Sequence, residues 1–341
     1  MKIFIPMAGK GTRLRPFTLT CPKPLLKIID KPIVEHLIDQ ITSKLTTPVD
    51  EIIYILGDEG YFNSDVVKSL TSISDKYNAK TKVYRQLDQL GTGHAIMCAE
   101  ESLEGPSIIA YADTMIQGEI SIDPDADGII WVKKVENPSS YGVVNLDKDG
   151  NISSLIEKPK DYISDLAVVG IYYFKDISLI RDELKIHLSE KLSPGKEYLL
   201  NFGIERMIDN KKIFKSQEIE TWMDCGTPKL LIDSAKKIMM KKAASDINNS
   251  LTEEGVVKIN HPVFIGKNVK IKDSEIGPYV SISDNAHICS SSIKSSLIYT
   301  GAKVSNADIE NSIFGAYSVY NGSSKEVFLG DYSQINDNED N

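Results

Sequence analysis

Apolar residues follow two alternating spacings along the first 245 residues. Short apolar runs at 3–5, 51–56, 82–85 and 106–113 are typical of buried strands, and the last run ends in the carboxylate of Asp113. Between the runs, aliphatic residues recur at helical spacing: Val34, Leu37, Ile38, Ile41 and Leu45, then Val66, Val67, Leu70 and Ile73. This order predicts an α/β fold built on a mostly parallel sheet.

The spacing changes after Asn249. Aliphatic residues then recur every five or six positions among Gly, Asn, Asp, Ser and Lys: Ile265, Ile271, Ile276, Ile282, Ile288, Ile293, Ile298, Val304 and Ile309. Neither a helix nor a series of hairpins has this period, whereas each coil of a β-solenoid points aliphatic residues inward. The segments at 265–269 and 276–280 resemble the hexapeptide repeat of left-handed parallel β-helices, and roughly three coils fit before Phe314.

These two patterns divide the chain into an α/β domain at 1–245, a left-handed β-helix domain at 246–330 and a polar tail at 331–341, which is expected to be disordered.

At 41% apolar and 26% charged residues, the composition is that of a soluble globular protein. The net charge of −9 argues against nucleic-acid and anionic-membrane partners. No segment has the pattern of a signal peptide or a membrane span, and four cysteines without C-x-x-C spacing favour reduced thiols in a cytoplasmic protein.

The first strand leads directly into a glycine-rich loop, Met7-Ala-Gly-Lys-Gly-Thr-Arg-Leu-Arg-Pro16. Gly9 and Gly11 allow backbone N–H groups to approach a ligand closely. Thr12, Arg13 and Arg15 add donors that suit phosphate oxygens. The loop therefore predicts polyphosphate binding at the edge of the sheet.

Two common phosphate-binding motifs do not fit this loop. A P-loop would need Lys-Ser/Thr after Gly11, and the chain has Thr-Arg there. A dinucleotide fingerprint would need a third glycine or alanine where Leu14 stands. Prolines at 16, 22 and 24 also discourage an immediate helix.

The longer string, Gly9-x-Gly-Thr-Arg-Leu-Arg-Pro16 followed by Pro22-Lys-Pro-Leu-Leu26, resembles the signature of the sugar-1-phosphate nucleotidyltransferases. The resemblance implies a Rossmann-like catalytic domain, often followed by a C-terminal β-helix. It also implies that Ala8, Gly9, Gly11 and Thr12 wrap a nucleoside triphosphate. Arg13 would contact its phosphates and Lys23 would lie near the reacting groups as catalytic cations, which agrees with the charge of a triphosphate.

The segment Gln86-x4-Gly-Thr-Gly-His-Ala95 resembles the base-binding segment of the same family. The resemblance implies that Gln86, Gly91 and Thr92 bind the nucleotide. The alternative is an ordinary strand-to-helix turn with Thr92 as the helix cap. The functional interpretation is favoured because the strand at 82–85 is expected to adjoin the first strand. A His at a helix start is usually structural, so His94 receives no catalytic role.

Asp113 and Asp224 match the family's two metal-binding carboxylates, and they imply a bound Mg²⁺. Each Asp alone could instead be a turn residue or a helix cap, since Asp224 precedes a glycine turn and a helix expected from Pro228. Many members read Gly-Asp-Asn at the first site, where this chain has Ala112-Asp113-Thr114. The carboxylate is kept and its neighbours differ.

The sugar-phosphate half resembles the family at Tyr141-Gly-Val-Val144, Glu157-Lys-Pro159, Val169-Gly-Ile-Tyr172 and the helix start at 197–205. The implied sugar-phosphate ligands are Gly142, Glu157, Lys158, Gly170 and Glu197, with Lys158 also catalytic. The alternative for Glu157 and Lys158 is a solvated charge pair. Asn201 and Phe202 replace the family's usual Thr-Asp pair, which bears on the identity of the sugar.

The sequence therefore predicts transfer of a nucleotidyl group from a nucleoside triphosphate to a hexose-1-phosphate, giving a nucleoside-diphosphate sugar and pyrophosphate. The base-binding segment favours UTP or dTTP; GTP with mannose-1-phosphate is the alternative. Two other classes stay open: a binding homologue without catalysis, and a β-helix acyltransferase, for which His261 and His287 lack a clear partner motif. Solenoid domains often bury their ends by self-association, so a homo-oligomer is expected.

Overall fold

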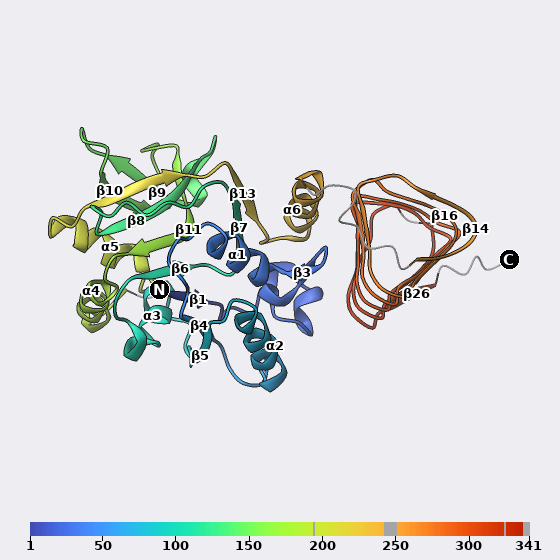
Figure 1. Ribbon diagram of the computed structural model, residues 1–341, viewed down its shortest axis with the longest axis horizontal. Coiled ribbons are helices and arrows are strands. Elements are labelled where there is room, and N and C mark those ends of the chain that lie inside the picture. The colour runs from blue at the N-terminus through green and yellow to red at the C-terminus, as the bar shows by residue number, and fades with distance from the viewer. Residues whose placement is uncertain (194, 242–250, 324, 337–341) are drawn as a thin grey trace. The chain divides into compact units, whose positions relative to one another are not determined.

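The computed structural model describes residues 1–193, 195–241, 251–323 and 325–336, and it divides into two compact units (Figure 1). Unit 1 comprises Met1–Gly9 and Val34–Trp222, and unit 2 comprises Lys10–Ile33 and Met223–Asn341. Unit 2 thus joins an N-terminal segment to the C-terminal part of the chain. The domain boundary predicted between 245 and 246 lies outside the described residues, and that division stays a prediction.

A nine-stranded mixed sheet forms the centre of unit 1. Its parallel part runs in the order β5 (Lys80–Arg85), β4 (Glu51–Leu56), β1 (Lys2–Pro6) and β6 (Ser107–Ala110). The remaining strands are β11 (Leu166–Phe174), β9 (Gly142–Leu146), β10 (Ile152–Glu157), β8 (Gly128–Lys134) and β12 (Phe214–Glu218). The α/β class is confirmed. Because β11 is antiparallel to β6, β8 and β9, the sheet is parallel mainly among the four strands from β5 to β6.

One expectation about strand order is wrong. The strand at 82–85, which is β5, pairs with β4 and not with the first strand. The neighbours of β1 are β4 on one side and β6 on the other. Because β6 precedes Asp113, it is Asp113, rather than the base-binding segment, that directly follows a neighbour of the first strand.

The helices of unit 1 bury their aliphatic faces against this sheet. They are α1 (Ile33–Thr42), α2 (Ser64–Asp75), α3 (Thr92–Met97), α4 (Ser178–Ser189) and α5 (Leu200–Asp209). Ile96, Leu184 and Ile204, from three of these helices, share one apolar cluster with Phe4 and Ile109 of the sheet. The sequence spacing predicted a helix that continues to Leu45, but α1 ends about one turn earlier, at Thr42.

Unit 2 begins with a segment of three short 3₁₀ turns, Thr12–Leu14, Phe17–Leu19 and Lys23–Leu25. A two-stranded ribbon follows, made of β2 (Lys27–Ile28) and β3 (Lys31–Pro32). The prolines of this segment prevent a continuous helix, as predicted. The helix expected from Pro228 is present as α6 (Pro228–Lys241).

The C-terminal part of unit 2 is a β-helix whose ladders are all parallel, consistent with the left-handed hexapeptide type (Figure 1). One ladder contains β14 (Leu251–Ile259), β16 (Val269–Ile276), β18 (His287–Cys289), β21 (Lys303–Ser305), β24 (Val319–Asn321) and β26 (Gln334–Asn336), and β19 (Ser292–Lys294) and β22 (Asp308–Glu310) continue from β16. A second contains β15 (Val263–Ile265), β17 (Val280–Ile282), β20 (Leu297–Ile298), β23 (Ile313–Phe314) and β25 (Phe328–Leu329).

The interior of the β-helix is aliphatic, as the sequence spacing predicts. All nine residues of the repeating series, from Ile265 to Ile309, belong to its buried cluster. Phe314 lies three coils after Ile265, counted along the second ladder, and one more coil follows it. Residues 334–336 pair with β24, so the segment predicted to be a disordered tail begins with an ordered strand.

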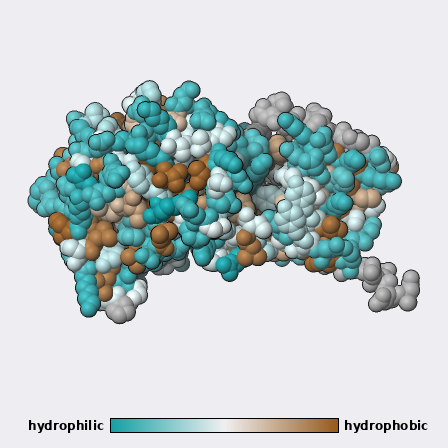
Figure 2. Space-filling view, turned by 90° about the horizontal axis from the view of Figure 1, so that it is seen from below, coloured by the Kyte–Doolittle hydropathy of each residue, from teal (hydrophilic) through white to brown (hydrophobic). Residues whose placement is uncertain are grey.

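The described residues include no helix that is long and apolar enough to cross a bilayer. Hydrophilic side chains cover most of the face seen in Figure 2, and apolar ones form small separate groups. Scattered exposed apolar side chains of this kind are ordinary for a folded protein.

Candidate active site

The loops after β1 and β6 lie at the same edge of the sheet, because these strands are parallel neighbours. Ala8 and Gly9 follow β1, and Asp113 follows β6. The predicted strand at 106–113 ends earlier, at Ala110, and Asp113 lies in a turn closed by the Thr114 N–H on the Tyr111 carbonyl at 3.2 Å. The carboxylate therefore stands in a tight turn beyond the strand end.

The part of the glycine loop in unit 1 offers open backbone. Ala8 is buried, and its carbonyl accepts from Gln89 Nε2 at 3.1 Å, which ties the loop after β5 to the loop after β1. Around Gly9, no described atom outside its chain neighbours lies within 4 Å of the position that a Cβ would occupy. A ligand phosphate can approach the backbone there.

The rest of the loop folds within unit 2 around Gly11. Its φ is 59°, a conformation that favours glycine, and a Cβ would lie 2.9 Å from Lys23 Cβ. Thr18 Oγ1 donates to the Gly11 carbonyl at 2.8 Å. Lys23 is consequently buried against Gly11, while Thr12 and Arg13 are exposed.

Arg13 and Asp224 lie beside the same glycine in unit 2. Asp224 is the last residue of β13 (Thr221–Asp224), and its Oδ1 accepts the Gly226 N–H at 2.7 Å. A Cβ on Gly226 would lie 3.2 Å from Arg13 Nη2. The structure thus brings together two of the predicted residues, a cation and a carboxylate, and it gives Asp224 the turn-stabilising role considered as its alternative.

The residue types fit a hard divalent cation. Asp113 and Asp224 offer carboxylate oxygens, the donors that Mg²⁺ prefers. Within the described residues, His, Cys, Asp and Glu side chains form no group of three or more that could hold a metal by themselves. Mg²⁺ commonly keeps water and substrate phosphate among its ligands, so a pair of carboxylates suits it. Asp113 belongs to unit 1 and Asp224 to unit 2, and their joint role stays a prediction.

Gln86 holds the turn that precedes α3. It is buried, and its Nε2 donates to the Gly91 carbonyl at 3.0 Å and to His94 Nδ1 at 3.2 Å. Gly91 has a φ of 122°, and a Cβ there would lie 2.6 Å from the Tyr198 carbonyl oxygen. Gln86 therefore positions the Gly91 backbone, and His94 supports Gln86 by accepting at Nδ1.

Thr92 is not the helix cap that the alternative interpretation assigned to it. The N-cap of α3 is Gly91, without a side-chain capping bond. Thr92 Oγ1 instead accepts the Leu200 N–H at 3.0 Å, which connects α3 to the first residue of α5.

Gly142 and Glu157 face each other in register on β9 and β10. Glu157 Oε2 accepts from Asn201 Nδ2 at 2.8 Å. A Cβ on Gly142 would lie 2.9 Å from that oxygen and 3.1 Å from that nitrogen. The bare backbone of Gly142 thus lets the Glu157 carboxylate and the Asn201 amide lie close against it, and an acceptor beside a donor is an arrangement suited to a sugar hydroxyl.

Lys158 stands next to this group with its side chain about two-thirds exposed. Its Nζ is 3.8 Å from Glu157 Oε1, and its N–H donates to the Tyr141 carbonyl at 3.0 Å. The exposed Lys158 matches the solvated-charge alternative. Glu157 does not match this alternative, because its side chain is only one-third exposed and its carboxylate is hydrogen-bonded to Asn201.

Gly170 is required by both its conformation and its surroundings. Its φ is 85°, and a Cβ would lie 2.7 Å from the Tyr111 ring. Its carbonyl accepts the Tyr111 N–H at 2.9 Å. Gly170 thereby seats Tyr111, and burial raises the pKa of the Tyr111 hydroxyl to about 12, so this hydroxyl stays protonated and can donate.

Glu197 and Phe202 do not join the group around Glu157. Glu197 is exposed in the loop before α5. The Phe202 ring stacks on His187 of α4, with 3.9 Å between ring centroids. Of the two family departures, only Asn201 contacts Glu157.

Sequence reasoning missed several aromatic residues here. Tyr141 packs edge-on against Trp222, with ring centroids 4.8 Å apart, directly before Gly142. Tyr111 packs similarly against Tyr172 at 5.7 Å. Each pair contains residues within two positions of a predicted site residue, and this proximity in the sequence was the available signal.

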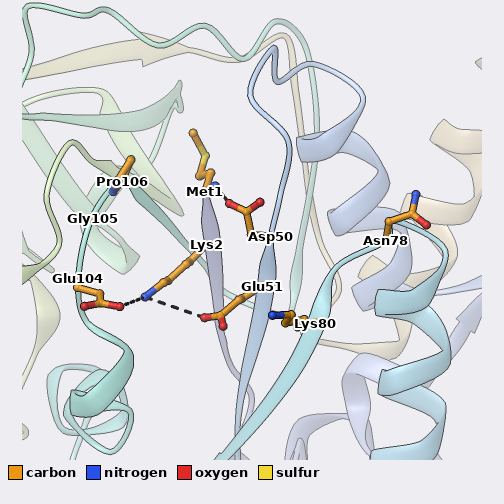
Figure 3. Close-up of a pocket in the computed structure, with 9 residues that line it drawn as sticks. All are labelled: Met1, Lys2, Asp50, Glu51, Asn78, Lys80, Glu104, Gly105 and Pro106. Carbon is orange, nitrogen blue, oxygen red and sulfur yellow. Dashed lines mark hydrogen bonds and ion pairs between the residues drawn. The ribbon is translucent and has the colours of Figure 1, made fainter.

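A separate hollow lies at the opposite edge of the sheet, where β1 and β4 begin (Figure 3). Lys2 Nζ lies 3.0 Å from Glu104 and 4.0 Å from Glu51, and the amino group of Met1 pairs with Asp50. These charges neutralise one another, and ligands of such sheets bind at the carboxyl ends of the strands. The hollow is therefore not the expected triphosphate site.

Comparisons with known proteins identify the family of the chain. Residues 4–241 match the family model for nucleotidyl transferases. The bifunctional protein GlmU of Methanococcus aeolicus is 32% identical over 92% of this chain and 77% of that protein. A glucose-1-phosphate thymidylyltransferase of Streptomyces antibioticus is 28% identical over 98% of this chain and 99% of that protein.

Among solved structures, a UDP-glucose pyrophosphorylase in complex with UDP-glucose has a TM-score of 0.56 and 25% identity, covering 71% of this chain and 99% of that one. The family match covers the glycine loop, both carboxylates and the Glu157 group. The chain therefore belongs to the nucleotidyl transferase family, among the sugar-1-phosphate nucleotidyltransferases.

Proposed function

We propose that this protein transfers a uridylyl or thymidylyl group from UTP or dTTP to a hexose-1-phosphate and releases pyrophosphate. The observation that carries the sugar half is the Glu157–Asn201 pair beside the bare backbone of Gly142. The names of two relatives, UDP-glucose pyrophosphorylase and glucose-1-phosphate thymidylyltransferase, support a pyrimidine nucleotide and a glucose-like sugar.

The reaction needs no nucleophilic side chain. A phosphate oxygen of the sugar-1-phosphate attacks the α-phosphorus in line, and the bond to the bridging oxygen of pyrophosphate breaks. The attacking oxygen is already anionic, so catalysis consists of positioning and charge stabilisation. Arg13 and Lys23 stabilise the triphosphate and the departing pyrophosphate. Lys158 holds the sugar phosphate, and Glu157 accepts a hydrogen bond from a sugar hydroxyl.

Asp113 and Asp224 are the carboxylates that would hold Mg²⁺. When bound, the ion would supply charge neutralisation to the phosphates. The expected homo-oligomer, the cytoplasmic location and the division into domains at 1–245 and 246–330 are parts of the same proposal.

Exchange of radiolabelled pyrophosphate into nucleotide tests this proposal against the binding homologue. The purified chain is incubated with Mg²⁺, labelled pyrophosphate and UDP-glucose or dTDP-glucose, and GDP-mannose serves as the guanylyl alternative. Label entering UTP or dTTP supports the proposal. Label entering only GTP would replace it with the guanylyl alternative. Binding of a nucleotide sugar without label transfer would identify a binding homologue.

A further inference from the structure

Asn201 connects the Glu157 carboxylate to the buried hydroxyl of Tyr172. Its Nδ2 donates to Glu157 Oε2 at 2.8 Å, and its Oδ1 accepts from the Tyr172 hydroxyl at 3.1 Å. Only 8% of Asn201 and 2% of Tyr172 are exposed. A carboxylate only accepts, so these two bonds fix which end of the Asn201 amide faces each partner.

Tyr172 is held in place by Tyr111. The two rings pack edge-on with their centroids 5.7 Å apart, and the Tyr111 N–H donates to the Gly170 carbonyl at 2.9 Å. Thr92 Oγ1 accepts the N–H of Leu200, the residue before Asn201, at 3.0 Å. These contacts hold both Tyr172 and the start of α5, the helix that carries Asn201.

The direction of the two hydrogen bonds of Asn201 is fixed. The Tyr172 hydroxyl has a single hydrogen and gives it to Asn201 Oδ1. This buried bond holds Asn201 Oδ1, which leaves Nδ2 aimed at Glu157.

We propose that Asn201 is a positioning residue for Glu157, through which it sets the affinity for the sugar phosphate; this rests on the proposed function. Asn201 holds Glu157 Oε2 beside the Gly142 backbone, where the carboxylate accepts from one ring hydroxyl of the sugar. This inference gives a role to a position at which the chain departs from the usual family pattern.

The main test is Asn201→Asp, which keeps the side-chain shape and the acceptor for Tyr172 but sets two carboxylates against each other. We expect KM for the sugar phosphate to rise about tenfold or more, with KM for the nucleotide unchanged. Asn145→Asp is the matched control, because Asn145 also donates from Nδ2, to Ser154 Oγ at 3.3 Å between β9 and β10. We expect it to leave both KM values unchanged.

A second variant keeps the inference testable if Asn201→Asp folds poorly. Tyr172→Phe preserves the Asn201–Glu157 bond but removes the donor that fixes the amide, and we expect a smaller rise, about threefold, again confined to the sugar phosphate. A series of monodeoxy analogues of the preferred sugar phosphate adds a sharper readout. The analogue that lacks the hydroxyl bound by Glu157 should show no additional loss in Asn201→Asp.

Equal changes in KM for both substrates, or a lower melting temperature with unchanged kinetics, would overturn the role of Asn201. If the wild-type chain releases no pyrophosphate with any substrate pair, the proposed function fails instead. Direct calorimetric titration of sugar-1-phosphate into the wild type and Asn201→Asp then decides the inference separately. Weaker binding by the variant supports the role of Asn201, and equal binding or none to either protein contradicts it.

Discussion

Gly142 is kept free of a side chain by its neighbours rather than by its backbone conformation. The space where a Cβ would lie is bordered by the Glu157 carboxylate and the Asn201 amide. Gly170, by contrast, combines a φ of 85° with the adjacent Tyr111 ring, so both conformation and space require glycine there. The two glycines of the sugar half therefore respond differently to substitution.

Gly142→Ala should raise KM for the sugar phosphate by about tenfold or more, because the new methyl group would lie 2.9 Å from Glu157 Oε2 and displace this carboxylate. The melting temperature should change little, since the backbone of β9 accepts alanine. Steady-state kinetics for both substrates and thermal melting check this together. A large fall in melting temperature with normal KM values would contradict the account of Gly142.

Lys158→Ala should raise KM for the sugar phosphate far more than KM for the nucleotide. Its exposed ammonium is free to reach an anionic substrate but contributes little to folding, as surface charge pairs are weak. Kinetics at two ionic strengths give the measurement, and the neighbouring exposed Lys160→Ala is the matched control. Equal effects on both substrates would remove Lys158 from the sugar-phosphate site.

At the scale of elements, the β-helix is held by serine hydroxyls as well as by its aliphatic interior. Ser291 Oγ accepts the N–H of Ala307, one coil further on, at 3.2 Å. Ser274 and Ser312 accept in the same manner from the N–H groups of Ser291 and Val327. These buried side chains satisfy backbone donors at corners where no ladder partner does so.

Ser291→Ala should lower the free energy of unfolding of the β-helix by about 1–3 kcal/mol, because the Ala307 N–H loses a buried acceptor. Ser292→Ala is the control, since the adjacent Ser292 is only partly buried. Chemical denaturation followed by circular dichroism measures both variants. Indistinguishable midpoints would show that the hydroxyl ladder adds no net stability.

Much at this scale could be predicted from the sequence. Strand runs, helical spacing and the five-to-six-residue period depend on local patterning, and they predicted β1, β4, α2, α6 and the β-helix interior. Strand order depends on long-range pairing, so β5 was placed beside the wrong strand. The contact between Asn201 and Glu157 joins residues 44 apart in the chain, and only the fold reveals it. The resemblance to a family provided the site residues that patterning alone would not have identified.

At the scale of the whole molecule, unit 2 places residues of the β-helix against the segment that carries Arg13 and Lys23. Thr20 Oγ1 donates to Asp331, and the Tyr299 hydroxyl donates to the Lys27 carbonyl at 3.1 Å. Burial, followed by the charge of Asp331, raises the pKa of the Cys21 thiol to about 12. The β-helix therefore supports the segment that carries Arg13 and Lys23 as well as its own core.

Asp331→Ala should increase the rate at which Cys21 is alkylated at pH 8, because both burial and the nearby negative charge keep the thiol protonated. Mass spectrometry of the Cys21 peptide measures the rate, and the Cys98 peptide of the same sample is the internal control. An unchanged rate would show that Asp331 does not hold this segment in place.

The most direct test of the central claim is pyrophosphate release with Mg²⁺ across a grid of nucleoside triphosphates and hexose-1-phosphates. UTP, dTTP, GTP and ATP are each combined with glucose-, galactose-, mannose- and N-acetylglucosamine-1-phosphate. We expect pyrophosphate release to require both substrates, to be fastest with UTP or dTTP, and to be fastest with one hexose-1-phosphate. Folded protein that releases no pyrophosphate from any pair would contradict it.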